Sequence, residues 1–292
     1  MNLSRREFLI ATGGALVVST IGRAQTSSAT VITVAYNILG CRGYPRNKYT
    51  EAALDAAAPT MHLRIADALA ETGADIVTLS ESPEEARVAA IAERLGFDHV
   101  FFPGGWPGDD QYPGGFPGAI LSRYPIRDAV NCPVAGEHDP ELFTRHFGRA
   151  VVDTPHGSLN VFTVHLFPND AVALRIREIE AVLAAIESAP ASELGALVQG
   201  DLNHAPDSEE YEVWTHVGLT DTFATRGEGD GPTFSSARAR WRIDYIWAHG
   251  KIADGLRSAA TLNSPPFATD PDDRSAFALS DHLPVEATFE LP

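Results

Sequence analysis

Eight polar side chains in this sequence are of types that bind a hard metal ion, accept a proton or donate to an anion. Most of them stand where an apolar, strand-like segment ends, and two stand together just before the last such segment. Strands that release polar groups at one edge of a sheet form a shared pocket there. The eight residues are Asn37, Glu81, His165, Asp201, Asn203, Asp244, Asp281 and His282.

Taken singly, most of these residues have an ordinary structural explanation. Asn37 is a turn former, and Glu81 can cap the helix that follows it. Asp201 and Asn203 can shape a loop, and a lone histidine such as His165 is more often a satisfied core residue. The buried carboxylate expected at position 244 and the adjacent acid and base at 281–282 are harder to explain in this way, because an unpaired buried carboxylate is costly.

Taken together, the residues fit the hydrolysis of a phosphate ester. This reaction needs a cation at the phosphate, a positioned water and donors for the developing charge. Magnesium prefers oxygen ligands and needs few of them if water completes its shell, and Asn37, Glu81 and Asp281 supply such oxygens. A carboxylate at Asp244 can hold the His282 imidazole in one tautomer.

The remaining three residues have roles in the same mechanism. Asp201 can orient the attacking water, while Asn203 and His165 can donate to phosphate oxygens.

In their order along the chain, the motifs around these residues resemble the endonuclease/exonuclease/phosphatase (DNase I-like) superfamily. Its members include DNase I-like nucleases, neutral sphingomyelinases and inositol polyphosphate 5-phosphatases. The matching pieces span 31–290 and are Tyr36-Asn37, Leu79-Ser80-Glu81, the Ala119–Ile126 segment, Thr163–Leu166, Gly200–Pro206, Arg242–Ile246 and Ser280–Pro284.

The resemblance implies a fold, a cofactor and residue roles. The expected fold is a four-layer αββα sandwich, with two mixed β-sheets face to face and helices outside. Asn37, Glu81 and Asp281 match metal-binding positions for Mg²⁺ or Mn²⁺, and His282 matches a histidine supported by Asp244. Asp201 and Asn203 match the pair of family residues that handles the nucleophile and the phosphate. His165 matches a histidine that contacts the phosphate.

Two features depart from the family pattern. Ser80 stands where the family commonly has Gln before the metal-binding Glu, and the Gly/Pro-rich aromatic loop 103–118 matches no known subfamily device.

The elements that must position these residues follow from hydrophobic periodicity. Residues 60–72 predict a helix, Pro83 predicts the first turn of another, and the longest helix is expected over 170–189. In that helix the stripe predicted to be buried is Val172, Ile176, Ile179, Leu183 and Ile186. Strands are predicted at 31–36, 75–79, 147–153, 158–165, 196–200, 242–247 (half-buried and alternating) and 284–290.

Residues 1–24 resemble a twin-arginine export signal, with Arg5-Arg6, an apolar run and small residues at the predicted cleavage site. We therefore expect the twin-arginine machinery as a partner, a periplasmic or secreted location, and a catalytic domain over 25–292. The apolar run is shorter than the roughly 20 residues a spanning helix needs, which argues against a stable membrane span in the mature chain. An oxidising compartment would permit Cys41 and Cys132 to pair, but the sequence leaves this open, as it does the oligomeric state.

Other functions are disfavoured or left open by the same motifs. No Gly-x-Ser-x-Gly or His-Glu-x-x-His motif supports a serine or zinc hydrolase. A catalytically inactive phosphate-binding protein is the alternative of a different class. The net charge of −17 argues mildly against a protein that coats DNA, without excluding a nuclease or a sphingomyelinase-like lipid phosphodiesterase.

Some residues near these motifs have two explanations. The cations Arg42, Arg46, Lys48, Arg145 and Arg149 either meet further phosphates or form a solvated face. The rings of Trp106, Tyr112 and Phe116 either stack on a ligand or pack within their own loop.

Overall fold

The computed structural model describes residues 30–110, 114–132 and 142–291. Two mixed sheets account for the strands of these residues. The first sheet has the order β10 (Gly227–Glu228), β12 (Leu256–Thr261), β13 (Val285–Glu290), β1 (Thr30–Asn37), β2 (Ile76–Ser80), β4 (Gly118–Ser122) and β3 (Asp98–Phe102). The second has the order β5 (Ile126–Cys132), β6 (Phe147–Thr154), β7 (Gly157–His165), β8 (Ala196–Asp201), β11 (Asp244–His249) and β9 (Thr220–Asp221).

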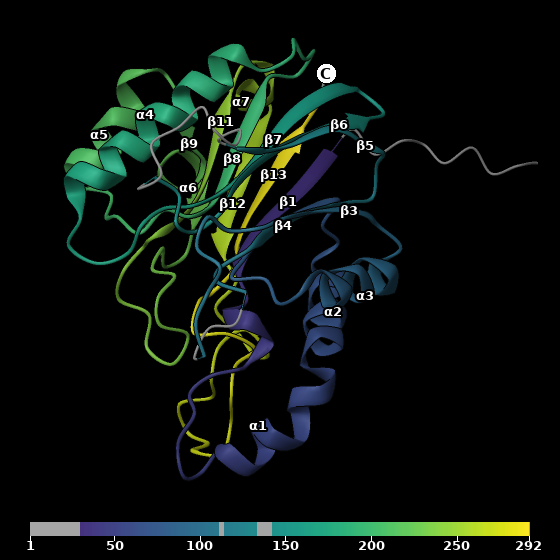
Figure 1. The fold of residues 1–292 in the computed structure, drawn as a ribbon, viewed down its shortest axis with the longest axis vertical. Helices are drawn as coiled ribbons and strands as arrows, with labels where there is room; N and C mark the ends of the chain where they lie inside the picture. Colours follow the sequence, from purple (N-terminus) through teal and green to yellow (C-terminus); the bar gives the residue numbers. More distant parts are fainter. Residues whose placement is uncertain (1–29, 111–113, 133–141, 292) are drawn as a thin grey trace, which may run out of the picture.

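The helices lie outside the two sheets (Figure 1). On one side, α2 (Met61–Thr72) and α3 (Glu85–Leu95) pack on the first sheet. On the other, α4 (Val172–Ser188) and α5 (Glu209–His216) pack on the second. The short helices are η1 (Leu39–Cys41), α1 (Glu51–Ala57), η2 (Ala58–Thr60), α6 (Thr222–Arg226) and α7 (Lys251–Asp254).

Apolar side chains fill the space between the sheets. Val31 and Ile120 of the first sheet share one cluster with Val161, Leu197 and Ile246 of the second. The central strands therefore bury one face against the opposite sheet and the other against a helix layer, which confirms the expected αββα sandwich. No helix among the described residues is long and apolar enough to cross a membrane.

Each sheet contains a central pair of parallel strands, and these pairs matter most for function. In the first sheet β1 runs parallel to β2, and in the second β7 runs parallel to β8. Parallel neighbours end at the same edge of a sheet, so residues at their carboxyl ends come together. Gly200 makes the second pair possible, since a Cβ there would lie 2.0 Å from the carbonyl oxygen of Val164.

Three expectations about local structure are wrong in detail. Pro83 lies before α3 rather than in its first turn, because the amide of Ser82 bonds to the Pro117 carbonyl (2.8 Å) and holds the entry segment outside the helix. β11 does not alternate: Asp244 to Ala248 are all buried, because a sheet face and a helix layer cover both sides.

The buried face of α4 is the third correction. Of the five residues predicted as its buried stripe only Ile179 is fully buried, and Val182, Arg175 and Glu178 are buried beside it. The helix is rotated relative to its apolar pattern because Arg175 and Glu178 have buried partners that no helical periodicity predicts.

Candidate active site

The strand ends bring the predicted polar residues to one edge of the sandwich. Asn37 ends β1 opposite Ser80 at the end of β2, and Glu81 follows directly. In the second sheet His165 ends β7 opposite Asp201 at the end of β8, and Asp201 faces Asp244 at the start of β11. Each position follows from strand pairing.

Asn37 connects the two sheets. Its side-chain amide donates to Glu81 Oε1 at 3.3 Å and to Asp201 Oδ2 at 3.0 Å, while its oxygen accepts from the Leu39 amide at 3.1 Å. One amide thus fixes a carboxylate from each sheet. Asn37 and Asp201 are almost fully buried, so these bonds have little competition from water.

Asp201 lies between both histidines of the predicted set. Its Oδ2 is 3.3 Å from Nε2 of His165 and 3.6 Å from Nε2 of His282. The other nitrogen of His282, Nδ1, is 2.8 Å from Asp244 Oδ2. The bond to Asp244 fixes the orientation of the His282 ring and directs its Nε2 toward Asp201, as expected for a carboxylate-supported histidine.

The charges of these residues depend on one another. Burial lowers the pKa of His282, but the attraction of Asp244 and Asp201 outweighs it and raises the pKa above the ordinary value. Burial raises the pKa of Asp201, and repulsion from Asp244 adds to that rise. Burial lowers the pKa of His165 well below its usual range, so His165 is a neutral imidazole at pH 7.

Glu81 and Asp281 form the acidic part of the site. Burial raises the pKa of Glu81, and the negative charge of Asp281 raises it further, while Arg145 lowers it. The structure therefore places Asp281 within electrostatic reach of Glu81. A carboxyl whose ionisation is opposed by burial and by a neighbouring negative charge is a place where a cation would be stabilising.

Two sets of residues could hold a cation, one on geometric grounds and one on the chemistry of its ligand atoms. Single ligand atoms of Asp201, Asp244 and His282 lie within 4.8 Å of one another. The bond between His282 and Asp244 already uses two of those atoms, however. The oxygen atoms of Asn37, Glu81 and Asp281 match the preference of magnesium for hard ligands, so this set fits the metal better.

Backbone strain coincides with the site. Glu81 and Asn203 have φ values of 49° and 52°, in the left-handed region that non-glycine residues rarely adopt. Asn203 is held by two bonds, from its amide to Asp201 Oδ1 (3.2 Å) and from its side chain to the Leu166 carbonyl (3.0 Å). Such strain persists where the surrounding structure fixes the residue, and it gathers at functional positions.

Part of the 103–118 loop forms an aromatic wall beside the acidic residues. The guanidinium of Arg145 lies 3.7 Å from the centre of the Phe116 ring and its Nη1 is 3.4 Å from Glu81 Oε1. The Trp106 ring stacks on Phe116 at 5.5 Å. Arg145, Trp106 and Phe116 are therefore near the predicted site, whereas Tyr112 lies outside the described residues.

Two further neighbours of the site carry no signal in the sequence. The Phe234 ring lies 4.9 Å from the His282 ring and limits its movement. His146 is fully buried, its Nε2 lies 3.1 Å from the Thr163 hydroxyl, and burial lowers its pKa to about 3. Both residues approach from distant parts of the chain, so only the folded arrangement identifies them.

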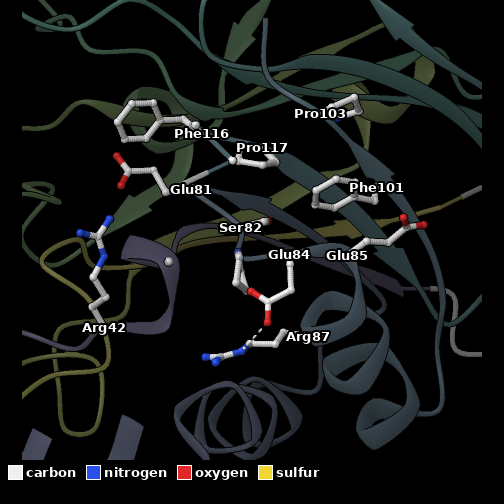
Figure 2. Close-up of a pocket in the computed structure, with 14 residues that line it drawn as sticks. Arg42, Glu81, Ser82, Glu84, Glu85, Arg87, Phe101, Pro103, Phe116 and Pro117 are labelled. Carbon is white, nitrogen blue, oxygen red and sulfur yellow. Dashed lines mark hydrogen bonds and ion pairs between the residues drawn. The ribbon is translucent and has the colours of Figure 1, made fainter. Parts of the chain in front are cut away.

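A cavity of about 700 Å³ opens beside Glu81 (Figure 2). Its walls come from the segment after β1, the entry of α3 and the 103–118 loop. Figure 2 shows the Glu81 carboxylate and the Phe116 ring at one end of the cavity and Glu85 at the other. A volume of this size is typical of small-molecule sites.

Sequence comparison identifies the class of protein. Residues 34–282 match the Endonuclease/Exonuclease/phosphatase family, so the chain belongs to that family. Its members are hydrolases that act on phosphate ester bonds. No curated protein sequence is similar enough to match this chain.

Solved structures share the fold at low sequence identity. An endonuclease/exonuclease/phosphatase from Beutenbergia cavernae is 20% identical with a TM-score of 0.66, covering 90% of this chain and 72% of the other. A mannosyl-6-phosphatase from Bacteroides thetaiotaomicron is 18% identical with a TM-score of 0.64 (88% and 98% coverage). A humanized D. rerio TDP2 is 22% identical with a TM-score of 0.61 (90% and 99% coverage).

Two expectations about the rest of the chain have different outcomes. Residues 1–24 lie outside the described residues, so the export signal stays a prediction. Cys41 and Cys132 are both free thiols in this structure, so they do not form a disulfide in it.

Proposed function

We propose that this chain is an exported phosphoesterase that depends on a divalent metal ion, Mg²⁺ or Mn²⁺. The observation that carries the proposal is the convergence of His282, Asp244 and Asp201 beside Asn37 and Glu81 at one sheet edge, with distances of 2.8 to 3.6 Å. Family membership supports the reaction class. A catalytically inactive binding protein has no need for this complete set of competent side chains.

The metal would be held by Asn37, Glu81 and Asp281. When bound, it supplies positive charge to the phosphate and lowers the pKa of an attacking water. The fit rests on the strained backbone of Glu81 and on the raised pKa of its carboxyl beside Asp281. Both features make the site less stable when no cation is bound there.

The protein's own side chains would orient the reacting groups. Asp201 accepts a hydrogen bond from the water and aligns it with the phosphorus, while Asn37 holds that carboxylate in place. His282, protonated and fixed by Asp244, donates from Nε2 to a phosphate oxygen. His165 and Asn203 complete the donor set near Asp201.

The substrate is proposed to be a small phosphate ester. The cavity beside Glu81 suits a small molecule, and the net charge of −17 disfavours a nucleic-acid backbone. A fold relative is a mannosyl-6-phosphatase, which supports the same class. DNase I-like nuclease or sphingomyelinase-like activity is the alternative, and diester or monoester cleavage is decided by the assay below.

The location is proposed from residues 1–24 alone. The paired arginines and apolar run support export through the twin-arginine machinery to the periplasm or the medium. Replacement of Arg5-Arg6 by Lys-Lys in a reporter fusion should block export. A fusion exported equally well after this change would contradict the twin-arginine route.

The test of the enzymatic proposal is a metal-supplemented screen of the protein over 25–292. Bis(p-nitrophenyl) phosphate, p-nitrophenyl phosphate, sugar phosphates, sphingomyelin vesicles, DNA and RNA serve as substrates. We expect EDTA to abolish turnover and Mg²⁺ or Mn²⁺ to restore it. Full turnover in the chelated sample would refute metal dependence, and no turnover on any substrate would favour a binding protein.

A further inference from the structure

Next to the cavity at Glu81 lies a second hollow of about 460 Å³. It is bounded by η1, η2 and the first turn of α3, and the two spaces share Gly40, Arg42 and Arg87. The second hollow is lined by three arginines, Arg42, Arg46 and Arg87, and by no acidic side chain among the described residues. In a chain with a net charge of −17 such a grouping needs an explanation.

The arginines differ in how they are held. Arg42 is held over its own turn by a bond from Nε to the Leu39 carbonyl (3.3 Å), and the amide of Gly40 bonds to the Glu81 carbonyl (2.8 Å). The wall of the hollow is thus attached to the acidic residue of the candidate site. In Figure 2 the Arg42 guanidinium points toward the Glu81 carboxylate.

Arg87 and Arg46 come from helical segments on the other side. Arg87 is paired with Glu84 at 2.8 Å, and Figure 2 shows its side chain extending below Glu84 toward the side of Arg42. Arg46 lies 2.9 Å from Asp55, with half of its side chain exposed. Exposed pairs of this kind contribute little, so an incoming anion can replace them at small cost.

An unpartnered polar group lines the cavity at Glu81, which shares Arg42 and Arg87 with the second hollow. Ser82 is 4% exposed, and its hydroxyl has no hydrogen-bond partner in the described part of the chain. It lies in the wall of the cavity just before α3, a helix of eleven residues. Buried hydroxyls normally have a partner, so this one indicates a ligand group at this position.

We propose that Arg42 and Arg87 bind a second anionic group of the substrate, a phosphate in a small bisphosphorylated molecule, while Ser82 contacts the part of the same molecule that lies in the cavity at Glu81. The inference rests on the proposed function, because the first phosphate would lie at Glu81. The second phosphate lies across the Arg42 wall, in the hollow lined by arginine. Glu84 and Glu85 also face the first cavity, so the anion is placed on the arginine side, away from Glu85 (Figure 2).

Arginine suits this task because its planar guanidinium can donate two parallel hydrogen bonds to one phosphate. A nucleic acid offers phosphates as well. The limited volumes of the two hollows, about 700 and 460 Å³, favour a small molecule over a continuous backbone.

The experiment measures binding, so that it does not depend on turnover. An Asp201→Asn background, holding Mg²⁺, is titrated calorimetrically with fructose 6-phosphate and with fructose 1,6-bisphosphate. We expect the bisphosphate to bind about tenfold or more tightly, since each charge-assisted contact contributes on that order. Arg42→Gln and Arg87→Gln should each bring the ratio of the two affinities close to one, and Arg46→Gln should lower it less.

Arg94 provides a matched control on the same helix. It forms an exposed pair with Asp67 at 2.7 Å and does not line either hollow, so Arg94→Gln should leave the ratio unchanged. A ratio unaffected by the Arg42 and Arg87 variants would overturn the proposal. So would arginine variants that lower only the affinity for a DNA duplex, with steep salt dependence, because they would assign the hollow to nucleic acid.

Failure of the proposed function has a different signature. In that case the wild-type protein would hydrolyse no phosphate ester in the presence of metal, whatever the binding ratio.

Discussion

The protein contains two groups of buried charged residues, and they differ in the partners that their charges meet. Between α4 and α5, Arg175 Nη2 lies 2.7 Å from Glu210, and Arg175 also donates to the carbonyl of Phe167. Glu178 accepts from the amides of Phe143 and Phe167 at 2.8 Å each. Every charge in this group meets a partner of opposite sign or a backbone amide.

At the sheet edge the charges are arranged differently. Asp201 is repelled by Asp244 and Glu81, and Glu81 is repelled by Asp281. Nδ1 of His165 is buried without a partner among the residues described. Evolution tolerates such an arrangement where a ligand completes it. Buried charge alone therefore does not mark a site, whereas buried carboxylates that repel one another beside an unpartnered polar atom do.

The largest expected effect is a loss of activity in variants of the sheet-edge residues. Asp201→Asn, Asp281→Ala and His282→Ala should each lower kcat/KM by at least about 10³-fold, about 4 kcal/mol of transition-state stabilisation. For Asp201→Asn and Asp281→Ala the free energy of unfolding should change by no more than about 1 kcal/mol, because repulsion is relieved as hydrogen bonds are lost. His282→Ala leaves the buried Asp244 carboxylate without its partner, so it should lower the free energy of unfolding by more than this. Steady-state kinetics and urea unfolding measure the two quantities.

The surface variant Asp153→Asn is the control for the kinetic losses, as Asp153 pairs with Arg127 at the surface. If folded His282→Ala turned over substrate at close to the wild-type rate, the sheet edge would be no more important for activity than the group between α4 and α5.

An effect of similar size is expected at the satisfied group between α4 and α5, but it falls on stability instead of activity. Glu210→Gln leaves Arg175 buried with a neutral partner, which should cost about 3–5 kcal/mol of unfolding free energy. Turnover per folded molecule should remain near the wild-type value at low temperature. The neighbouring Glu209 is exposed, so Glu209→Gln should change stability by less than about 0.5 kcal/mol.

Destabilisation by Glu210→Gln equal to that of the exposed control would show that the buried pair contributes no more than its surface neighbour.

The smallest expected effect is a pH dependence from Glu178. Burial raises the pKa of its carboxyl from 4.5 to about 6, against the amides of Phe167 and Phe143, which lower it. Between these pH values the folded state binds more protons than the unfolded state, so stability falls as pH rises from 4.5 through 6. The loss approaches about 2 kcal/mol by pH 7.

Urea unfolding from pH 4 to 7 measures this dependence. In Glu178→Gln the part of the slope due to this carboxyl should vanish, although the variant has its own constant cost from an altered hydrogen bond to the Phe143 amide. An unchanged slope would show that Glu178 is not the titrating group.

The fold class and most of the sheet edge that carries the site can be predicted from the amino-acid sequence. Apolar runs that end at Asn37, Glu81, His165 and Asp201 specify strands with a polar group at one end, and parallel neighbours must then present these groups together. Such patterns are local, because backbone periodicity and turn preferences act over a few residues. The pairing of Asp244 with His282 was predicted as well, and the distance of 2.8 Å agrees.

Only the tertiary structure decided which charges are satisfied and what else reaches the site. The rotation of α4 toward Arg175, the burial of both faces of β11 and the approach of Phe234 to His282 depend on contacts between distant segments. The same holds for the hollow shared by Arg42 and Arg87, 45 positions apart along the chain. The physical reason is that burial and electrostatic field arise from the packed neighbours, and the identity of those neighbours is a property of the whole fold.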